Sequence, residues 1–330
     1  MRKERINWLL ILQAWTMLWV VIGHAPLGEP GEGPVWENAL YNTAYSFHMC
    51  LFVLISGFLF YKTRISDPSW NYARMIVDKA GRLLIPMFFF TCIAFVLKYL
   101  FPGEVGRDVS LSAKEFVMAF VSPYNGPLRE MWFILCIFTM FALMPLWRTI
   151  LSNRILSIIA LVALLALYYF YPKTEILNIG RSLHYAIWFM AGLLIARYDS
   201  VVETGKKYKW LLLLGGVLVY SAGFWAGPIF KASGGILVSF AVAFVLDKYL
   251  PKIFSSYRDY TYQIFLIGIF AQVAVRILYR RIPMPYFVAW LICALAGLYV
   301  PVLVSKLLQI VNSGFLLSLV GLKKQNNRNK

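Results

Sequence analysis

Apolar runs of about twenty residues recur from one end of this sequence to the other, separated by short polar segments. The first run extends from Trp8 to Val21 and ends at Gly23 and His24. A helix of about twenty apolar residues is what the roughly 30 Å hydrocarbon core of a bilayer requires. Only 14% of the 330 residues are charged, whereas about 25% are charged in a typical soluble domain. The pattern therefore predicts an all-α, polytopic integral membrane helical bundle.

About ten transmembrane helices are predicted, and no polar stretch is long enough to fold as a soluble domain. Lys and Arg concentrate in the loops that this topology places in the cytoplasm, so both termini are predicted to be cytoplasmic. The same distribution explains the net charge of +17 without a nucleic-acid partner. We expect one transmembrane domain over residues 1–322 and a basic, disordered tail over residues 323–330. The predicted spans are residues 8–25, 39–61, 83–101, 131–147, 155–171, 182–196, 210–227, 233–247, 260–279 and 286–308.

All three histidines lie in or beside predicted spans. His24 is at the outer end of the first span, His48 near the middle of the second, and His184 near the outer start of the sixth. An ionisable side chain in a bilayer is costly unless it is satisfied or functional, so each histidine is a candidate site residue. Structural alternatives remain open, because His24 can cap a helix at the interface and His48 can be a satisfied interior histidine.

Two predicted outer loops flank these positions. The first, residues 26–38, is acidic, contains no Lys or Arg, and includes Glu37. The second, residues 102–130, is the longest extramembrane segment and is expected to form a turn-rich cap. It ends at Glu130, which shares a predicted depth with His24 and His184. A carboxylate beside an imidazole sets its tautomer and raises its basicity, so Glu130 is a candidate to orient His24 as a general base.

Four segments, in this order along the chain, resemble motifs of the membrane-bound acyltransferase 3 family. The resemblance covers nearly the whole chain, and the second and fourth motifs are fairly specific in combination. In its compact size the chain is most similar to the sugar O-acetylases that modify polysaccharides. The four segments are Val20-Val21-Ile22-Gly23-His24, Phe47-His48-Met49-Cys50-Leu51-Phe52-Val53-Leu54-Ile55-Ser56-Gly57-Phe58-Leu59, Lys79-Ala80-Gly81-Arg82-Leu83-Leu84-Ile85-Pro86 and Leu128-Arg129-Glu130-Met131-Trp132-Phe133-Ile134-Leu135.

The resemblance implies a ten-helix enzyme that takes an acyl group, usually acetyl, from cytoplasmic acyl-coenzyme A. It implies delivery of that group to a hydroxyl of an envelope or exported carbohydrate, polymeric or lipid-linked. By the same resemblance His24 is the catalytic histidine, and Glu130 and Trp132 line the transfer site. Lys79 and Arg82 match a basic pair that holds the coenzyme phosphates. Acyl-CoA is then a co-substrate, no permanent cofactor or metal ion is expected, and the enzyme would be a multi-pass protein of the plasma or inner membrane in contact with its lipids.

The chemistry restricts the residue types independently of the family. Acyl transfer from a thioester to a hydroxyl needs a base for the hydroxyl proton and donors for the tetrahedral oxyanion. Lys79 and Arg82 share a helix face, although by position alone they can equally be positive-inside anchors. The catalytic candidates are His24, Glu130 and His48; the candidates for the coenzyme phosphates are Lys79, Arg82 and Arg74; the candidates for substrate binding are Trp132, Asn42, Tyr45 and His184.

Three positions depart from the family pattern. The family usually has Asp at the position of Leu10, Arg or Lys at the position of Gln13, and His at the position of Gly268. The missing Arg removes a fixed charge that could bind a phosphate or a developing oxyanion, so an inactive family member is one alternative. A second alternative is a transporter or flippase for a small molecule or lipid-linked sugar, with the histidines and Arg276 forming its path.

Overall fold

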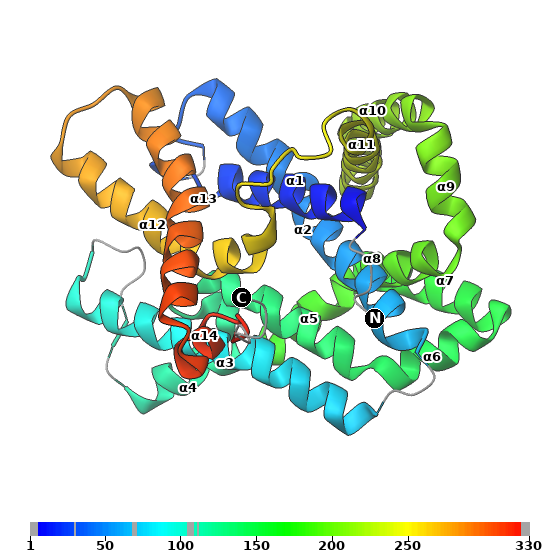
Figure 1. Cartoon of the computed structure of the whole chain (residues 1–330), viewed down its shortest axis with the longest axis horizontal. Helices are drawn as coiled ribbons and strands as arrows, with labels where there is room; N and C mark the ends of the chain where they lie inside the picture. The colour runs from blue at the N-terminus through cyan, green and yellow to red at the C-terminus, as the bar shows by residue number, and fades with distance from the viewer. Residues whose placement is uncertain (1–5, 30, 68–70, 104–108, 111, 325–330) are drawn as a thin grey trace. The chain divides into compact units, whose positions relative to one another are not determined.

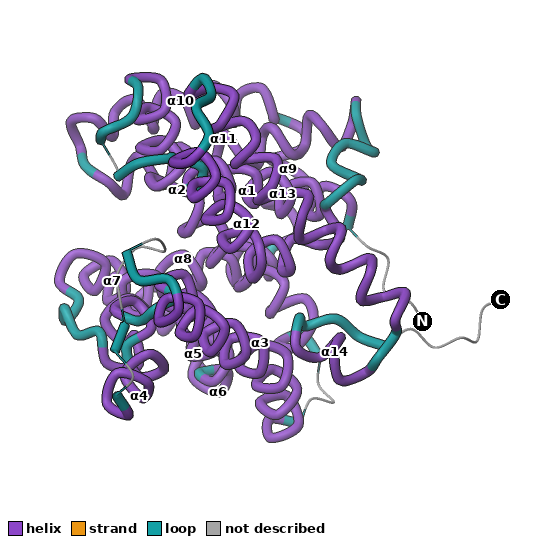
Figure 2. The backbone as a smooth tube through the Cα atoms, turned by 90° about the vertical axis from the view of Figure 1, so that its left-hand side faces the viewer, coloured by secondary structure: helices purple, strands orange, loops and turns teal. Residues whose placement is uncertain are grey.

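The structure is a computed structural model of the chain and describes residues 6–29, 31–67, 71–103, 109–110 and 112–324. These residues form helices joined by turns and loops, with no strand among them (Figure 2). The all-α prediction is therefore confirmed. The helices labelled in Figure 1 are α1 (Asn7–Gly23), α2 (Val35–Phe60), α3 (Tyr72–Leu100), α4 (Ala113–Val121), α5 (Trp132–Ala142), α6 (Met144–Ser152), α7 (Arg154–Phe170), α8 (Ile179–Arg197), α9 (Asp199–Lys207), α10 (Lys209–Ala226), α11 (Pro228–Tyr249), α12 (Thr261–Arg281), α13 (Tyr286–Val311) and α14 (Gly314–Leu319).

Seven helices are long and apolar enough to cross a membrane, namely α2 with its π-helical extension Tyr61–Ile65, α3, α8, α10, α11, α12 and α13. Helices α5 and α6 are bent by 54° relative to each other and add an eighth span if the pair counts as one. The apolar helices α1 and α7 have 17 residues each. Every predicted span thus falls on a described helix or on this bent pair, and the protein is a polytopic helical membrane protein. The cytoplasmic location of the termini stays a prediction, and most of the predicted tail lies outside the described residues.

The chain forms two compact units. The first consists of Met1–Phe52 and Tyr198–Val311, and the second of Val53–Arg197 and Asn312–Lys330. Helix α2 contributes to both units, because the boundary falls between its residues Phe52 and Val53. Each unit is described by itself, and the predicted single domain over residues 1–322 stays a prediction.

Helix α1 is the central helix of the first unit, because it packs against α11, α12 and α13. Ile11, Leu12 and Ala14 are completely buried. The indole of Trp15 donates a hydrogen bond to the Ser239 hydroxyl of α11 at 3.2 Å. A helix that is apolar on all sides must be surrounded by other apolar surface, and here neighbouring helices supply it.

In the second unit, α2 and α8 cross at small residues. Gly57 faces the carbonyl oxygen of Phe189, and Gly192 faces that of Leu54. A Cβ at either glycine would overlap the opposing carbonyl oxygen. Small residues allow membrane helices to approach closely where apolar side chains alone give no preference between lipid and protein. This crossing fixes the carboxyl-terminal half of α2 against α8.

The second outer loop is more helical than the sequence predicts. Residues Ala113–Val121 form α4, which begins where the Ser112 side chain accepts a hydrogen bond from the backbone N–H of Glu115. Its phenylalanines pack against phenylalanines of α3: Phe120 stacks on Phe88 at 5.1 Å between ring centroids, and Phe116 meets Phe95 edge-on at 5.6 Å. The segment that follows α4 does form the expected tight turns, at Pro123–Asn125 and Arg129–Met131. An amphipathic helix of nine residues is too short to give a transmembrane signal, and it was therefore missed.

Candidate active site

Three predicted site residues come together in the first unit, at the end of α1 and on α2. The Tyr45 hydroxyl lies 3.5 Å from Nδ1 of His24, which follows the last residue of α1. The Tyr45 ring packs edge-on against both imidazoles, with centroid distances of 5.9 Å to His24 and 5.0 Å to His48. His48 is 1% exposed, and its Nδ1 lies 2.5 Å from the carbonyl oxygen of Ala44. Tyr45 and His48 are three residues apart, so they share a face of α2.

Hydrogen-bond chemistry assigns the proton of the His48 imidazole and allows one particular tautomer of His24. A carbonyl oxygen only accepts, so Nδ1 of His48 is the protonated nitrogen that donates to Ala44. A tyrosine oxygen can accept as well as donate, so Nδ1–H of His24 can donate to Tyr45 and leave the lone pair on Nε2. A neutral imidazole held at Nδ1 with a lone pair at Nε2 can take a proton from a hydroxyl group. Asn42, one turn before Tyr45, is exposed on α2, and its side chain makes no hydrogen bond to a described residue.

Two side chains of α12 hold the end of α1. The amide of Gln272 donates to the carbonyl oxygen of Val21 at 2.9 Å, and the Arg276 guanidinium donates to that of His24 at 2.6 Å. Neither residue belongs to the predicted site. The sequence feature that indicates a role for Arg276 is its position within an apolar span, because a charged side chain there is costly without a partner or a function.

The acidic first loop also differs from its prediction. Glu37 lies in the first turn of α2 rather than in a solvated loop, and it is 2% exposed. Its Oε2 accepts a hydrogen bond from the Tyr286 hydroxyl at 2.6 Å. The first turn of a helix favours an acidic side chain, because the unpaired N–H groups there are partly positive.

The structure gives a physical reason for one departure from the family pattern. A Cβ at Gly268 would lie 2.8 Å from the carbonyl oxygen of Gly297, so α12 and α13 cross too closely there for a histidine side chain. Gln13 is partly buried on α1, and its side chain makes no hydrogen bond to a described residue.

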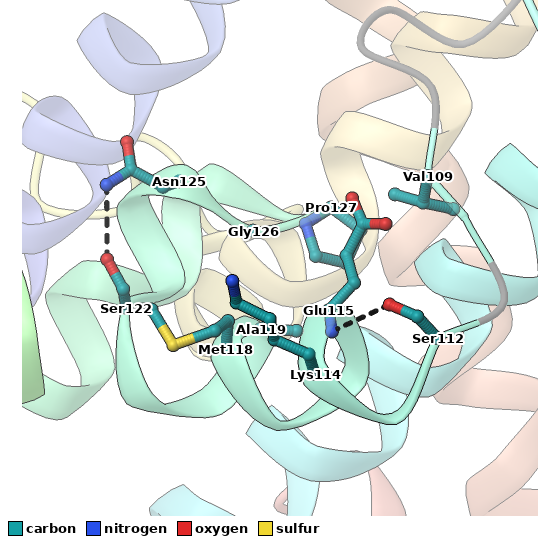
Figure 3. Close-up of a pocket in the computed structure, with 10 residues that line it drawn as sticks. All are labelled: Val109, Ser112, Lys114, Glu115, Met118, Ala119, Ser122, Asn125, Gly126 and Pro127. Atoms are coloured by element: carbon teal, nitrogen blue, oxygen red, sulfur yellow. Dashed lines mark hydrogen bonds between the residues drawn. The ribbon is translucent and has the colours of Figure 1, made fainter.

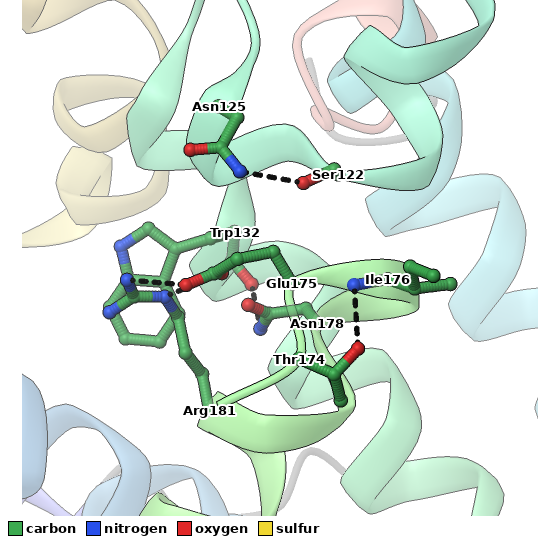
Figure 4. A network of polar contacts seen from close by, with 8 residues as sticks. All are labelled: Ser122, Asn125, Trp132, Thr174, Glu175, Ile176, Asn178 and Arg181. Carbon is green, nitrogen blue, oxygen red and sulfur yellow. Dashed lines mark hydrogen bonds and ion pairs between the residues drawn. The ribbon is translucent and has the colours of Figure 1, made fainter. Parts of the chain in front are cut away.

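In the second unit, Trp132 is the first residue of α5 and is 8% exposed. Its indole stacks on the Tyr185 ring at 5.2 Å between centroids. The Arg181 guanidinium lies 3.3 Å from the centroid of the Tyr124 ring and 5.6 Å from that of Trp132. It also makes two hydrogen bonds of 3.2 Å to the Glu175 carboxylate (Figure 4). A guanidinium that is paired and also stacked on aromatic rings is held in one orientation.

A tight turn before α8 supports Trp132. Leu177 and Asn178 both have positive φ angles, 49° and 56°. Asn178 is 1% exposed, and its amide donates to the carbonyl oxygen of Trp132 at 2.9 Å (Figure 4). Two consecutive non-glycine residues in the left-handed region are unusual, and such backbone is found preferentially at functional sites.

His184 is surrounded by aromatic rings in the same unit. Its Nδ1 lies 2.8 Å from the carbonyl oxygen of Tyr168 and therefore donates to it. The imidazole stacks on the Tyr168 ring at 4.3 Å, with Tyr171 at 4.7 Å and Tyr185 at 4.9 Å between centroids. Tyr185 contacts both His184 and Trp132, so these two predicted residues belong to one aromatic cluster.

Glu130 also lies in the second unit, half-buried in the turn Arg129–Met131. The predicted orientation of His24 by Glu130 joins residues of the two units and stays a prediction.

A cleft of about 330 Å³ lies in the second unit between α4 and the turn that follows it (Figure 3). Glu115, Lys114 and Asn125 are among its lining residues, and none of them was predicted as a site residue.

The predicted phosphate-binding residues all lie on α3. Arg74 and Arg82 are exposed, whereas Lys79 is half-buried with its ammonium 3.9 Å from the centroid of the Phe141 ring. An α-helix rises 1.5 Å per residue, so Trp132 lies about 14 Å from Phe141 along α5. Because the Lys79 ammonium contacts the Phe141 ring, Trp132 lies about 14 Å along α5 from the level of Lys79 as well.

Among the residues that the structure describes, no group of three or more His, Cys, Asp or Glu side chains could hold a metal ion.

Comparison with known proteins identifies the family. A family model described as an acyltransferase domain matches residues 6–306. Nodulation protein NolL of Mesorhizobium japonicum is 28% identical over 204 residues, which are 59% of this chain and 49% of NolL, so the chain spans about half the length of this relative. No solved structure gives a significant match. The matched region includes nearly all the helices and both clusters described above, and the chain therefore belongs to the acyltransferase domain family and is a multi-pass membrane protein.

Proposed function

We propose that this chain is an acyltransferase that moves an acyl group, with acetyl as the favoured case, from cytoplasmic acyl-CoA to a hydroxyl of an envelope or exported carbohydrate. The observation that supports this most is His24, an imidazole at the end of an apolar helix with Nδ1 facing the Tyr45 hydroxyl. That imidazole is suited to take the hydroxyl proton, which is the step that an O-acyl transfer needs most.

In the proposed reaction, Nε2 of His24 takes the proton of the acceptor hydroxyl while the oxygen attacks the thioester carbonyl. The tetrahedral oxyanion needs hydrogen-bond donors, and the Tyr45 O–H is the nearest candidate to His24. The carbon–sulfur bond then breaks and the ester forms. The imidazolium returns its proton to the coenzyme thiolate, so His24 is neutral at the start and at the end.

The donor is proposed to bind at the start of α3. The exposed guanidinium groups of Arg74 and Arg82 can form charge-assisted hydrogen bonds to phosphate oxygens. Arg64 lies in the π-helical turn that extends α2, and it forms a 4.0 Å ion pair with Asp78 of α3. Lys79 adds a cation that is partly enclosed by the rings of Phe60 and Phe141.

The acceptor is proposed to bind at the aromatic cluster of Trp132, Tyr185 and His184 in the second unit. Binding sites for small polar molecules combine aromatic walls with a few oriented polar groups. A sugar presents C–H faces to aromatic rings and hydroxyls to imidazole or guanidinium groups. His184 fits this use, because Nδ1 is already bonded to Tyr168 and Nε2 remains to accept from a hydroxyl.

The short length of α5 supports transfer inside the membrane rather than at its surface. Phosphates held near Lys79 and a sugar held near Trp132 would be separated by about 14 Å along α5, which is about half of the roughly 30 Å hydrocarbon core. The acyl arm of the donor would then need to reach only part of the way across the bilayer.

Membranes containing the chain should transfer radiolabelled acetyl from acetyl-CoA into a carbohydrate fraction. The label should be released by mild base, as expected for an O-ester. The matched controls are membranes without the chain and acetyl-CoA labelled only in its adenine. If no acyl-CoA gives transfer but the membranes exchange a lipid-linked sugar, the acyl-transfer proposal is wrong and a transporter is favoured.

A further inference from the structure

The carboxyl end of α1 needs outside help to be stable in a membrane. The last carbonyl groups of a helix have no partner within that helix, and lipid offers none. Gln272 and Arg276 supply donors to Val21 and His24, at 2.9 and 2.6 Å. The second acceptor is the carbonyl oxygen of the candidate base itself.

Both donors come from one face of α12. Gln272 and Arg276 are four residues apart, so their side chains project from the same side of the helix, one turn apart. A cation at a helix carboxyl terminus is also favourable, because the unpaired carbonyl groups there are partly negative. Helix α12 therefore fixes the end of α1 at two successive turns.

Arg276 shares the first unit with a buried carboxylate, that of Glu37. Glu37 is 2% exposed, and its Oε1 is a buried oxygen without a hydrogen-bond partner. Nε of Arg276 is likewise buried and unpartnered. An intramembrane arginine is costly unless a partner or a task retains it, and the partner that the structure shows for Arg276 is the carbonyl oxygen of His24.

We propose that Arg276 is a positioning residue for His24. The guanidinium donates a hydrogen bond to the carbonyl oxygen of His24 and thereby fixes the backbone there. The backbone of His24 in turn determines the position of its imidazole relative to the Tyr45 hydroxyl. This inference rests on the proposed function, in which His24 is the general base. Arg276 itself touches no substrate in this role.

The first test is steady-state kinetics of acetyl transfer by Arg276→Gln. The value of kcat should fall by about 10- to 100-fold, since a displacement of about 1 Å at a reacting group can cost about 10²-fold. The KM for acetyl-CoA should stay unchanged. Arg276→Lys should recover part of kcat, because an ammonium can donate to the same carbonyl oxygen. Arg280→Gln, at an exposed arginine one turn further along α12, is the matched control and should behave as the wild type.

The second test reads the position of His24 without any activity. Diethyl pyrocarbonate modifies accessible neutral imidazoles, which predominate at about pH 8 because the usual histidine pKa is about 6.5. In Arg276→Gln, mass spectrometry should show faster modification of His24 and an unchanged rate at His184 in the second unit. His184 thus serves as an internal control for global damage.

Three results would overturn the inference. They are a wild-type kcat in Arg276→Gln, an acetyl-CoA KM that rises as much as kcat falls, and equal acceleration of labelling at His24 and His184. If Arg276→Gln does not accumulate in membranes, Arg276→Lys takes its place: reduced kcat with unchanged KM and faster labelling of His24 than of His184 supports the proposal, and reduced kcat with unchanged labelling of His24 refutes it. Full activity of His24→Ala would refute His24 as the base, whereas the labelling comparison would still test the positioning by Arg276.

Discussion

The turn before α8 allows a quantitative test of how the second unit supports Trp132. Asn178 contributes in two ways, through its left-handed backbone and through its hydrogen bond to Trp132. A non-glycine residue in that region costs roughly 1–2 kcal/mol, which asparagine tolerates better than most residues. A hydrogen bond of this kind contributes about 0.5–1.5 kcal/mol to stability.

Asn178→Ala should therefore lower the free energy of unfolding by about 1.5–3.5 kcal/mol, as the sum of both contributions. Asn178→Gly is the matched variant, because glycine accepts the positive φ but lacks the amide, so mainly the hydrogen bond is lost. Leu177→Gly should be stabilising by about 0–1.5 kcal/mol. Glycine at position 177 removes about 1–2 kcal/mol of backbone strain from the folded state. It also increases the conformational entropy of the unfolded chain, which costs about 0.5–1 kcal/mol of stability.

The assay is tryptophan fluorescence during unfolding by sodium dodecyl sulfate in mixed micelles with a neutral detergent. The expected order of stability is Leu177→Gly at or above wild type, then wild type, Asn178→Gly and Asn178→Ala. Equal stability of the alanine and glycine variants at position 178 would refute the backbone contribution. Wild-type stability of both would refute the contribution of the hydrogen bond.

Two further predictions concern the proposed substrates. Lys79→Met keeps an unbranched side chain over the Phe141 ring but removes the charge, so KM for acyl-CoA should rise about tenfold or more, because one charge-assisted hydrogen bond contributes roughly 1.5–3 kcal/mol. Steady-state kinetics would contradict donor binding at Lys79 if KM stayed unchanged. His184→Phe keeps the stacking on Tyr168 but removes the hydrogen-bonding nitrogens, so KM for the acceptor should rise while KM for acyl-CoA does not. An increase in the acyl-CoA KM alone would move His184 to the donor side.

The helices could be predicted from the sequence because membrane spans depend on length and hydropathy, which are local properties. The apolar run from Trp8 to Val21 became α1, and the run after Trp132 became α5. The bend between α5 and α6 was not predicted. It occurs next to Pro145, which cannot donate a backbone hydrogen bond to a continuous helix.

The contacts around His24 could be predicted only in part. Tyr45 and His48 are candidates because of their residue types and their predicted depth in the second span. Arg276 could not be placed, because its bond to His24 joins residues 252 positions apart and hydropathy does not say which helix faces pack together. Glu37 was misplaced because it follows Glu29 and Glu32 in a segment rich in Gly and Pro, and nothing local distinguishes the carboxylate that becomes buried.

The most direct test of the central claim is the rate of acetyl transfer by His24→Ala, compared with wild type at equal amounts of protein in membranes. If His24 is the general base, the rate should fall by about 10²–10⁴-fold while KM for acetyl-CoA is unchanged. A His24→Ala enzyme that transfers acetyl to carbohydrate as fast as the wild type would contradict the account.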